Sequence, residues 1–299
     1  MESTNTKSSE TIRVAIQGGL GSFHQIASEK FFGEIKIEII PCNTFYDLFD
    51  VLKEGNADCG MMAIENSVAG SLLQNYTMLR ESNIKICGEV YLRIEQHLVA
   101  LKGESIDNLK EIHSQPIAIQ QCMEYLNPLR RKNVRIVEAD DTALSAKWIQ
   151  DEQLKGFAAI SSELAANMYD LQILQRNIET NHRNFTRFLL ITDSKQVMDL
   201  EQISKQQVNK SSLCFTSPHT EGSLAQILSV LAYYKMNLTK IQSLPIVGVE
   251  WEYQFYIDLM FDEYSRYRLA LGAIEPLTKK LEILGEYQNG QRPPENKII

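Results

Sequence analysis

The sequence predicts an α/β protein with two parts, a larger N-terminal part and a smaller C-terminal β-α-β-β-α-β module of the ferredoxin-like kind. In about the first 195 residues, short runs rich in β-branched residues alternate with amphipathic stretches, a pattern typical of parallel sheets joined by helices. Residues 194–210 are polar and contain few large apolar side chains. The pattern changes after them, so we expect a linker there and a separate module beyond it.

The elements of the N-terminal part follow from the spacing of apolar residues. Isoleucines alternate with charged residues over 35–39, as in a half-buried strand, and apolar residues recur at helical spacing over 22–32. Thr44 and Asp47 have the spacing of a capping box. The same rules place strands at 13–16, 35–39, 58–64, 135–139, 157–161 and 188–192, and helices at 22–32, 44–52, 71–80 and 116–126, with one more helix that begins near Asp141 or Thr142 and contains Trp148.

The C-terminal module is predicted in the same way. Apolar residues on one helix face mark 222–234, and every second residue from Trp251 to Leu259 is large and apolar, which favours a strand with a buried stripe. The predicted strands are 212–216, 237–246, 251–259 and 283–287, and the predicted helices are 222–234 and 265–284.

Charge and composition exclude several classes of function. Lys and Arg number 30 and Asp and Glu 38, a net charge of −8, so no basic surface is expected for nucleic acid or an anionic membrane. An anionic ligand must then be attracted by local groups such as helix N-termini. The first residues lack an apolar targeting core, and no apolar run reaches the roughly 18 residues of a membrane helix, so we expect a cytoplasmic protein.

The cysteines and histidines indicate neither a disulfide framework nor a metal site. The five cysteines are odd in number and widely spaced, which predicts reduced core thiols; they are Cys42, Cys59, Cys87, Cys122 and Cys214. The five histidines show no paired ligand spacing and no Ser-His-Asp set, so each is interpreted as structural or superficial. We expect no metal and no cofactor.

Four predicted strands end in a short polar or glycine-rich segment just before a helix, at residues 18–22, 65–67, 114–116 and 140–142. Such junctions are where α/β proteins bind ligands. Residues 18–22 could bind an anion through backbone amides, or could form only a tight turn. Residues 65–67 could orient a hydroxyl and bind a carboxylate, or could cap a helix. Thr186 and Arg187 could be an ordinary strand residue and a surface cation, but their position at a strand start favours a cleft.

These segments occur in the order found in prephenate dehydratases, which the chain resembles from about residue 12 to 287. The matching segments are 17–23 (Q-G-G-L-G-S-F, for L-G-P-x-G-T/S-F/Y), 64–71 (for I-E-N-S-x-x-G-S), 114–122 (for S-H-P-Q-x-x-x-Q-C), 158–161 with Ala165, Ala166 and Tyr169, and 184–188 (N-F-T-R-F, for N-x-T-R-F). Three positions depart from the pattern: Gly19 replaces a proline, Gln115 a histidine and Ile117 a glutamine.

The resemblance implies a two-lobed catalytic domain like the type II periplasmic binding proteins. Its implied bounds are 12–193, with lobe 1 at 12–80 and 181–193 and an inserted lobe 2 at 81–180, followed by the linker at 194–210 and a regulatory domain at 211–290. The implied activity, a step of phenylalanine biosynthesis, is the decarboxylative dehydration of prephenate to phenylpyruvate. That reaction requires no metal, nucleotide or covalent nucleophile.

The chemistry of this reaction suggests roles for two residues of the site. We hypothesise that Thr186 hydrogen-bonds the leaving hydroxyl and that Glu65 is a proton source if burial raises its pKa. The substrate-binding residues implied by motif position are Asn66, Ser67, Ser114, Gln121, Arg187, Gly21, Ser22 and Phe185.

The C-terminal module resembles an ACT domain, which in this family binds phenylalanine and pairs between subunits. Residues 221–224 (E-G-S-L) stand where P-G-A-L is usual, and 241–245 (I-Q-S-L-P) where I-E-S-R-P is usual, so Gln242 and Leu244 replace two charged residues. The implied effector-binding residues are Gly222, Ser223, Leu224, Gln242, Ser243 and Pro245. We therefore expect phenylalanine as an effector and a homodimer or higher homo-oligomer.

Two alternative functions remain open at the level of sequence. An arogenate dehydratase performs the same elimination on the amino analogue of prephenate, and a non-catalytic ACT-containing ligand sensor would share the architecture. The pair of Glu65 and Thr186 argues against passive binding, which has no need of it.

Overall fold

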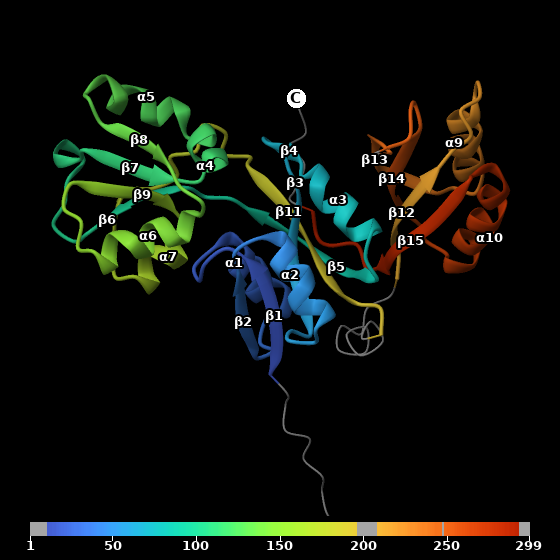
Figure 1. Cartoon of the computed structure of the whole chain (residues 1–299), viewed down its shortest axis with the longest axis horizontal. Helices are drawn as coiled ribbons and strands as arrows, with labels where there is room; N and C mark the ends of the chain where they lie inside the picture. The colour runs from blue at the N-terminus through green and yellow to red at the C-terminus, as the bar shows by residue number, and fades with distance from the viewer. Residues whose placement is uncertain (1–10, 196–207, 247, 293–299) are drawn as a thin grey trace, which may run out of the picture. The chain divides into compact units, whose positions relative to one another are not determined.

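The computed structural model describes residues 11–195, 208–246 and 248–292 (Figure 1). The chain forms two compact units. Among the described residues, the first contains 11–72 together with Val90–Phe188, and the second contains Leu73–Glu89 together with 189–195, 208–246 and 248–292. Within the described ranges, no helix is long and apolar enough to cross a membrane. Most of the expected linker, residues 196–207, lies outside the described residues, and the expected domain bounds stay predictions.

The first unit begins with a sheet in the strand order β11-β3-β1-β2. The central strand β1 pairs in parallel with β2 and β3, and its adjacent residues Val14 and Ala15, which point to opposite faces, are both fully buried, as in a sheet covered on both faces. The predicted capping box is confirmed, because Thr44 and Asp47 exchange side-chain to backbone hydrogen bonds of 3.0 and 3.1 Å. The elements are β1 (Ile12–Gln17), α1 (Phe23–Phe32), β2 (Ile37–Cys42), α2 (Phe45–Lys53), β3 (Cys59–Asn66), its hairpin partner β4 (Gly70–Ser71) and β11 (Phe185–Asp193).

A second sheet of the first unit has the order β10-β6-β9-β7-β8. Strands β7, β8 and β9 run parallel, and β6 and β10 are antiparallel additions that the sequence patterns did not reveal. Helices α4 and α5 cover one face of this sheet, and α6 and α7 cover the other (Figure 1). The elements are β6 (His97–Ala100), η1 (Ile106–Asn108), β7 (Glu111–Ser114), α4 (Pro116–Gln121), α5 (Met123–Arg131), β8 (Arg135–Glu138), α6 (Thr142–Asp151), β9 (Phe157–Ser161), α7 (Glu163–Met168) and β10 (Gln172–Gln175).

The helix predicted at 116–126 is not continuous. Cys122 has φ −109° and ψ 15°, outside the helical region, and it separates α4 from α5. The Cys122 N–H bonds to Ile119, three residues back, which tightens the last turn of α4. The apolar spacing continues across this break because both helices pack on the same core, so periodicity alone predicts one helix.

The second unit contains the predicted β-α-β-β-α-β order, with an antiparallel sheet β13-β14-β12-β15. One core joins the sheet to both of its helices, and Ile227, Leu259 and Ile274 in it are fully buried. The elements are β12 (Lys210–Thr216), α9 (Ser223–Tyr233), β13 (Asn237–Pro245), β14 (Tyr253–Met260), α10 (Tyr264–Ile274), η2 (Glu275–Leu277) and β15 (Lys280–Tyr287), together with α3 (Leu73–Arg80) and the first residues of β5 (Ile84–Arg93). Gly285 lets β15 approach β5, because a side chain there would collide with the Ile86 carbonyl.

Two expectations for the second unit are wrong. The helix predicted at 265–284 ends at Ile274, and Pro276 lies in the short 3₁₀ turn that follows. The residues from Lys280 form β15 because they pair with β12 along its whole length. Trp251 is not a core residue: it lies in the turn before β14, has φ 60° and is 75% exposed.

A fully buried ion pair joins β12 to β5 in the second unit. The Lys210 Nζ lies 2.8 Å from both carboxylate oxygens of Glu89, and neither side chain is exposed. The Gly290 N–H donates a further hydrogen bond of 2.9 Å to Glu89. All five cysteines are free and buried, which confirms the prediction of core thiols.

Candidate active site

A pocket of about 140 Å³ lies in the first unit, where strand ends meet helix starts. Asn66 on β3 and Thr186 on β11 line it. It is also lined by the residues that directly precede three helices, which are Ser22 before α1, Gln115 before α4 and Asp141 before α6. Its volume is close to the roughly 150 Å³ cavity that holds one benzene molecule. The pocket therefore suits a compact ring rather than a nucleotide.

Thr186 is held in this pocket by an amide. The Asn66 Nδ2 donates to Thr186 Oγ1 at 2.9 Å and to Asn184 Oδ1 at 2.7 Å, while the Asn66 Oδ1 accepts the N–H groups of Val68 and Ala69. A hydroxyl has one proton to donate in addition to its acceptor positions. Since Thr186 uses an acceptor position for Asn66, its own proton is left to donate toward a ligand.

Two glutamines extend this network across the pocket. The Gln121 Nε2 lies 3.5 Å from the side-chain oxygens of Asn66 and Asn184, and its Oε1 accepts from Gln96 Nε2 at 3.2 Å. The Gln121 side chain comes from α4, and Gln96 precedes β6. The second sheet thus supplies amide groups to the wall that carries Thr186.

Several buried polar atoms around the pocket have no hydrogen-bond partner among the described residues. They are Ser22 Oγ, Gln96 Oε1 and Asn184 Nδ2. Ser22 is 3% exposed, Gln96 2% and Asn184 0%, so bulk water has little access to hydrogen-bond these three polar atoms. Because unpaired buried polar groups cost free energy, such a concentration indicates a place that a polar ligand completes.

Part of the pocket wall is aromatic. His24 packs edge-on against Phe45 and Phe188, with ring centroids 5.7 and 5.1 Å apart. The His24 Nε2 accepts the Ala63 N–H at 3.3 Å, which places the proton of the neutral ring on Nδ1. Burial lowers the pKa of His24 to about 4, so the ring is neutral at physiological pH.

The pocket has little charge of its own. No Lys or Arg of the described ranges lines it, and its one carboxylate belongs to Asp141. Burial raises the pKa of Asp141, although the N–H groups of Leu144, Ala143 and Gly19 oppose that shift by bonding to the charged form. Attraction for an anion must therefore come from peptide dipoles, chiefly at the N-terminus of α1.

Glu65 and Arg187 do not line this pocket. Glu65 directly precedes the pocket residue Asn66 on β3, and Arg187 directly follows the pocket residue Thr186 on β11. Adjacent residues of a strand point to opposite faces of the sheet. On that other face the Arg187 Nη1 lies 3.8 Å from Glu65 Oε2, with Arg187 buried and the Glu65 side chain 40% exposed. The roles expected for both residues stay predictions, and this geometry gives Glu65 no direct path to the Thr186 hydroxyl.

Four other predicted binding residues also lie outside the pocket lining. Ser67 is exposed and bonds the backbone of Arg183 and Phe185, which ties the end of β3 to the start of β11. The Ser114 hydroxyl donates to the Ile160 carbonyl within the second sheet. Gly21 has φ 87° and packs so closely on Ala165 that a side chain would collide. These contacts explain the residue types by structure alone.

The prediction from sequence missed His24, Gln96 and Asp141 as pocket residues. Asp141 was expected as a helix cap within one of the four strand-helix junctions but was not named as a site residue, and His24 was expected only as a structural or superficial histidine. The one signal for both was position: each lies within two residues of a junction between a predicted strand and a helix. No local pattern marks Gln96.

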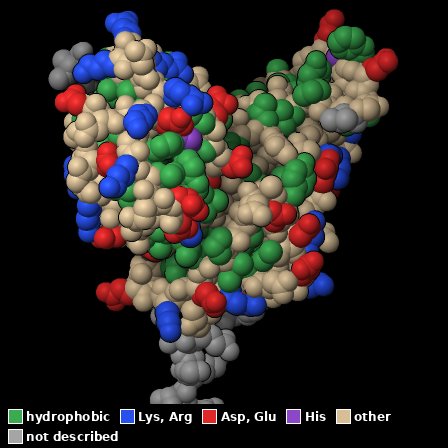
Figure 2. Space-filling model, turned by 60° about the vertical axis from the view of Figure 1, so that its left-hand side comes forward, with side chains coloured by type: hydrophobic (Ala, Val, Ile, Leu, Met, Phe, Trp, Pro, Cys, Tyr) green, Lys and Arg blue, Asp and Glu red, His purple; other side chains and the backbone are tan. Residues whose placement is uncertain are grey.

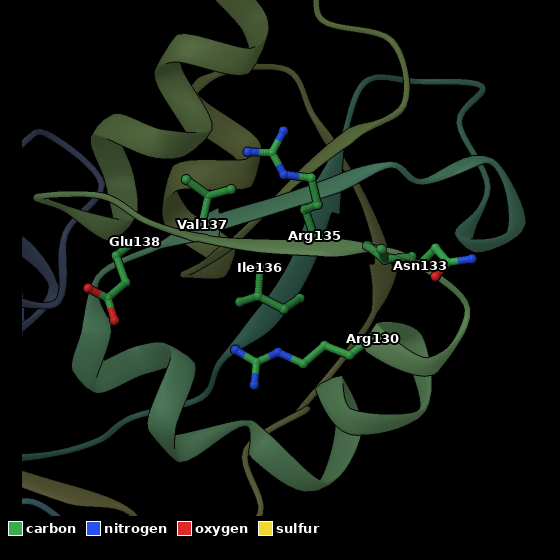
Figure 3. Close-up of a pocket in the computed structure, with 7 residues that line it drawn as sticks. Arg130, Asn133, Arg135, Ile136, Val137 and Glu138 are labelled. Atoms are coloured by element: carbon green, nitrogen blue, oxygen red, sulfur yellow. The ribbon is translucent and has the colours of Figure 1, made fainter.

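A second hollow, about 650 Å³, runs along β8, the edge strand of the second sheet (Figure 3). Arg135 and Val137 project from one side of the strand and Ile136 from the other, with Arg130 of α5 beside it. This hollow is larger than the active-site pocket, but it lies along the open edge of the sheet. None of its lining residues has a buried, unpartnered polar atom in the described part of the chain.

The family model for prephenate dehydratase matches residues 14–196, which span both sheets of the first unit and the strands that carry Asn66 and Thr186. The chain belongs to the prephenate dehydratase family. The α/β fold with mixed sheets agrees with solved structures of that family. One is a prephenate dehydratase from Arthrobacter aurescens in complex with L-Phe, with a TM-score of 0.79 and 25% identity over 93% of this chain and 90% of that chain.

Two relatives whose names include prephenate dehydratase are similar in sequence to this chain over most of its length. The bifunctional chorismate mutase/prephenate dehydratase of Aquifex aeolicus is 33% identical over 92% of this chain and 73% of its own length. The chloroplastic arogenate dehydratase/prephenate dehydratase 2 of Arabidopsis thaliana is 33% identical over 92% of this chain and 72% of its own length. The names of the relatives thus include both prephenate, the keto substrate, and arogenate, the amino substrate.

Burial of His24 predicts a loss of stability in acid. The unfolded chain binds a proton on this residue below about pH 6.5, but the folded protein does so only below about pH 4, so the free energy of unfolding falls as the pH drops through that range. At 1.36 kcal/mol per pKa unit, the loss reaches about 3 kcal/mol. Urea unfolding of the wild type and of His24→Gln at pH 7 and 4.5 measures it.

The glutamine variant keeps an acceptor for the Ala63 N–H but does not titrate. We expect it to lose less stability than the wild type between the two pH values, whereas His219→Gln, at an exposed position, should behave as the wild type. Equal acid sensitivity of the wild type and His24→Gln would contradict the assignment.

Proposed function

We propose that this protein converts prephenate to phenylpyruvate. The ring carboxylate leaves as carbon dioxide, and the ring hydroxyl takes up one proton and leaves as water. The observation that carries the proposal is the Thr186 hydroxyl, which Asn66 holds in the pocket with its own proton left to donate. The names of the Aquifex and Arabidopsis relatives support the same reaction.

The pocket favours this elimination in two ways. Thr186 donates a hydrogen bond to the departing hydroxyl, and because an alcohol is a weak acid, it polarises the C–O bond rather than transferring its proton outright. The aromatic wall of His24, Phe45 and Phe188 packs on the ring and replaces water near the ring carboxylate. With no cation beside it, that carboxylate gains from becoming neutral carbon dioxide.

The test is incubation of the purified protein with prephenate while the absorbance of phenylpyruvate is followed. We expect enzymatic conversion, and its absence would reject the proposal in favour of the ligand sensor. Parallel assays with arogenate compare kcat/KM for the keto and amino substrates. In the same assay, unchanged turnover of Glu65→Gln would remove Glu65 from proton delivery.

The second unit is proposed to be an ACT domain that binds phenylalanine. Its support is the β-α-β-β-α-β order together with the L-Phe bound in the Arthrobacter structure. Gly222 adopts φ 77° directly before α9, and Ser223 begins that helix. Gln242 and Leu244 point to the same half-buried face of β13, because they are two residues apart on a strand.

Gln242 and Leu244 stand where the usual ACT pattern has two charged residues, and the absence of these charges predicts weak binding of phenylalanine. A free amino acid carries an ammonium and a carboxylate, and a hydrogen bond to a charged group contributes about 1.5–3 kcal/mol. We expect calorimetry to give at least about tenfold tighter binding of phenylalanine to a Gln242→Glu, Leu244→Arg double variant than to the wild type. Equal affinities, or tighter binding by the wild type, would contradict the prediction.

Assembly as a homodimer or higher homo-oligomer is proposed to use the second unit. β13 is an edge strand there, and apolar side chains nearby are exposed, with Tyr233 at 83%, Trp251 at 75% and Ile241 at 44%. Light scattering that gives a monomer at working concentration would reject this. Figure 2 shows one face of the molecule, on which acidic, basic and hydrophobic side chains lie among one another.

The cytoplasm is the proposed location, because five free cysteines remain reduced there. Fractionation that recovers the protein from another compartment would reject this.

A further inference from the structure

Asp141 is the one carboxylate among the described residues that line the active-site pocket. It is the N-cap of α6 and is 8% exposed. Its Oδ1 accepts the Leu144 N–H at 2.8 Å, and the N–H groups of Ala143 and Gly19 also donate to the carboxylate. A carboxylate offers about four acceptor positions, so three backbone donors leave one for a ligand.

The charge of Asp141 has no counter-ion in the described part of the protein. No Lys, Arg or His of the described residues interacts with its carboxylate, which accepts hydrogen bonds from three backbone N–H groups. A helix cap needs no charge, since Ser, Thr and Asn serve equally well. A buried carboxylate that faces a pocket without a cation will attract a cation in the ligand.

An anion-binding group lies directly beside it. Ser22 is the N-cap of α1, lines the same pocket and is 3% exposed, yet its Oγ has no partner among the described residues. Both side chains border Gly18: a Cβ there would lie 3.7 Å from Ser22 Cβ and would collide with Asp141 Oδ2. The positive N-terminus of α1 and the Asp141 carboxylate are therefore close enough for one small ligand group to contact both.

We infer that Ser22, with the N-terminus of α1, and Asp141 form a subsite for an α-amino acid head group, which makes Asp141 a specificity residue for the amino form of the substrate. The carboxylate of the head group bonds Ser22 and the first turn of α1, and its ammonium bonds Asp141. The inference rests on the proposed function and concerns which substrate the site prefers. The amino form, arogenate, takes up one proton and loses carbon dioxide and water to give phenylalanine, the same proton balance as for prephenate.

The keto form fits this subsite less well. A keto oxygen has only lone pairs to present to the Asp141 carboxylate, whereas an ammonium presents three donors and a positive charge. Prephenate also carries two negative charges against one net negative charge on arogenate. Discrimination therefore comes from attraction of one substrate and repulsion of the other.

The test is steady-state kinetics of the full chain and of Asp141→Asn with both substrates. Asparagine is isosteric with aspartate and equally good as an N-cap, so it removes the charge without removing the cap. We expect kcat/KM for arogenate to fall about 10–100-fold, as for loss of a charge-assisted hydrogen bond, while kcat/KM for prephenate rises because the repulsion is removed. Asp140→Asn, which removes the same charge at the neighbouring exposed position, is the matched control and should change neither value.

Each contrary outcome overturns the inference in a distinguishable way. Equal losses with both substrates would make Asp141 a structural or general acid-base residue. An unchanged ratio of the two kcat/KM values would remove it from substrate recognition. A wild type that converts prephenate but not arogenate would overturn the inference alone, whereas a wild type that converts neither would overturn it together with the proposed function.

Discussion

Replacing Thr186 with valine is expected to lower kcat by about 10²–10⁴-fold, the range of a single group that assists proton movement. Valine has nearly the shape of threonine, but it cannot donate to the departing hydroxyl and it leaves one of the two hydrogen bonds of Asn66 Nδ2 unmade. Binding should change less than turnover, since the hydroxyl is needed most when the C–O bond breaks. Rapid assays of kcat and KM with the preferred substrate measure both quantities.

Thr186→Ser is the matched control, because it restores the hydroxyl on the same backbone. We expect it to recover most of the lost turnover. The thermal midpoint of the valine variant should remain near that of the wild type, because one neutral hydrogen bond contributes only about 1 kcal/mol. A valine variant that turns over as fast as the wild type would remove Thr186 from the mechanism.

Replacing Lys210 with methionine is expected to destabilise the second unit by about 3–5 kcal/mol, the cost of leaving one member of a buried ion pair without its partner. The methionine fills the space of the lysine stem, but Glu89 then stays in a site with no exposure and loses the ammonium that paired with it. Urea unfolding, followed by circular dichroism, gives the change in the free energy of unfolding.

A second substitution should reverse most of this loss. Glu89→Gln removes the stranded charge and keeps an acceptor for the Gly290 N–H, so the Lys210→Met, Glu89→Gln double variant should approach the stability of the wild type. Lys280→Met, in an ion pair whose lysine is 66% exposed, is the control and should change stability by less than about 1 kcal/mol. Equal effects of Lys210→Met and Lys280→Met would contradict the assignment.

Local rules predicted the regular elements because those rules act over a few residues. The capping box of Thr44 and Asp47 depends on a spacing of three, and the alternation over 35–39 depends on a spacing of two. The same rules failed where tertiary contacts compete. Residues 280–284 carry apolar spacing that suits a helix, but pairing with β12 makes them a strand.

The site was predicted in part for the same reason. The motifs identified Asn66, Gln121, Ser22 and Thr186, and the structure brings all four to one pocket. They also named Glu65 and Arg187, yet strand alternation turns those two side chains away from it. His24 and Asp141 enter the pocket because of how α1 and α6 pack, and no spacing in the chain encodes that.

By itself the sequence determined the α/β class, the β-α-β-β-α-β module, the buried reduced cysteines and the family, because each depends on local periodicity or on short ordered motifs. Only the tertiary structure decided which polar groups share the pocket and which of them lack a partner. Asn66 and Thr186 are 120 residues apart, and their contact depends on the pairing of strands that meet only in the folded chain. A change of one residue in strand register would turn every such side chain to the other face, so their chemistry depends on the register of the whole sheet.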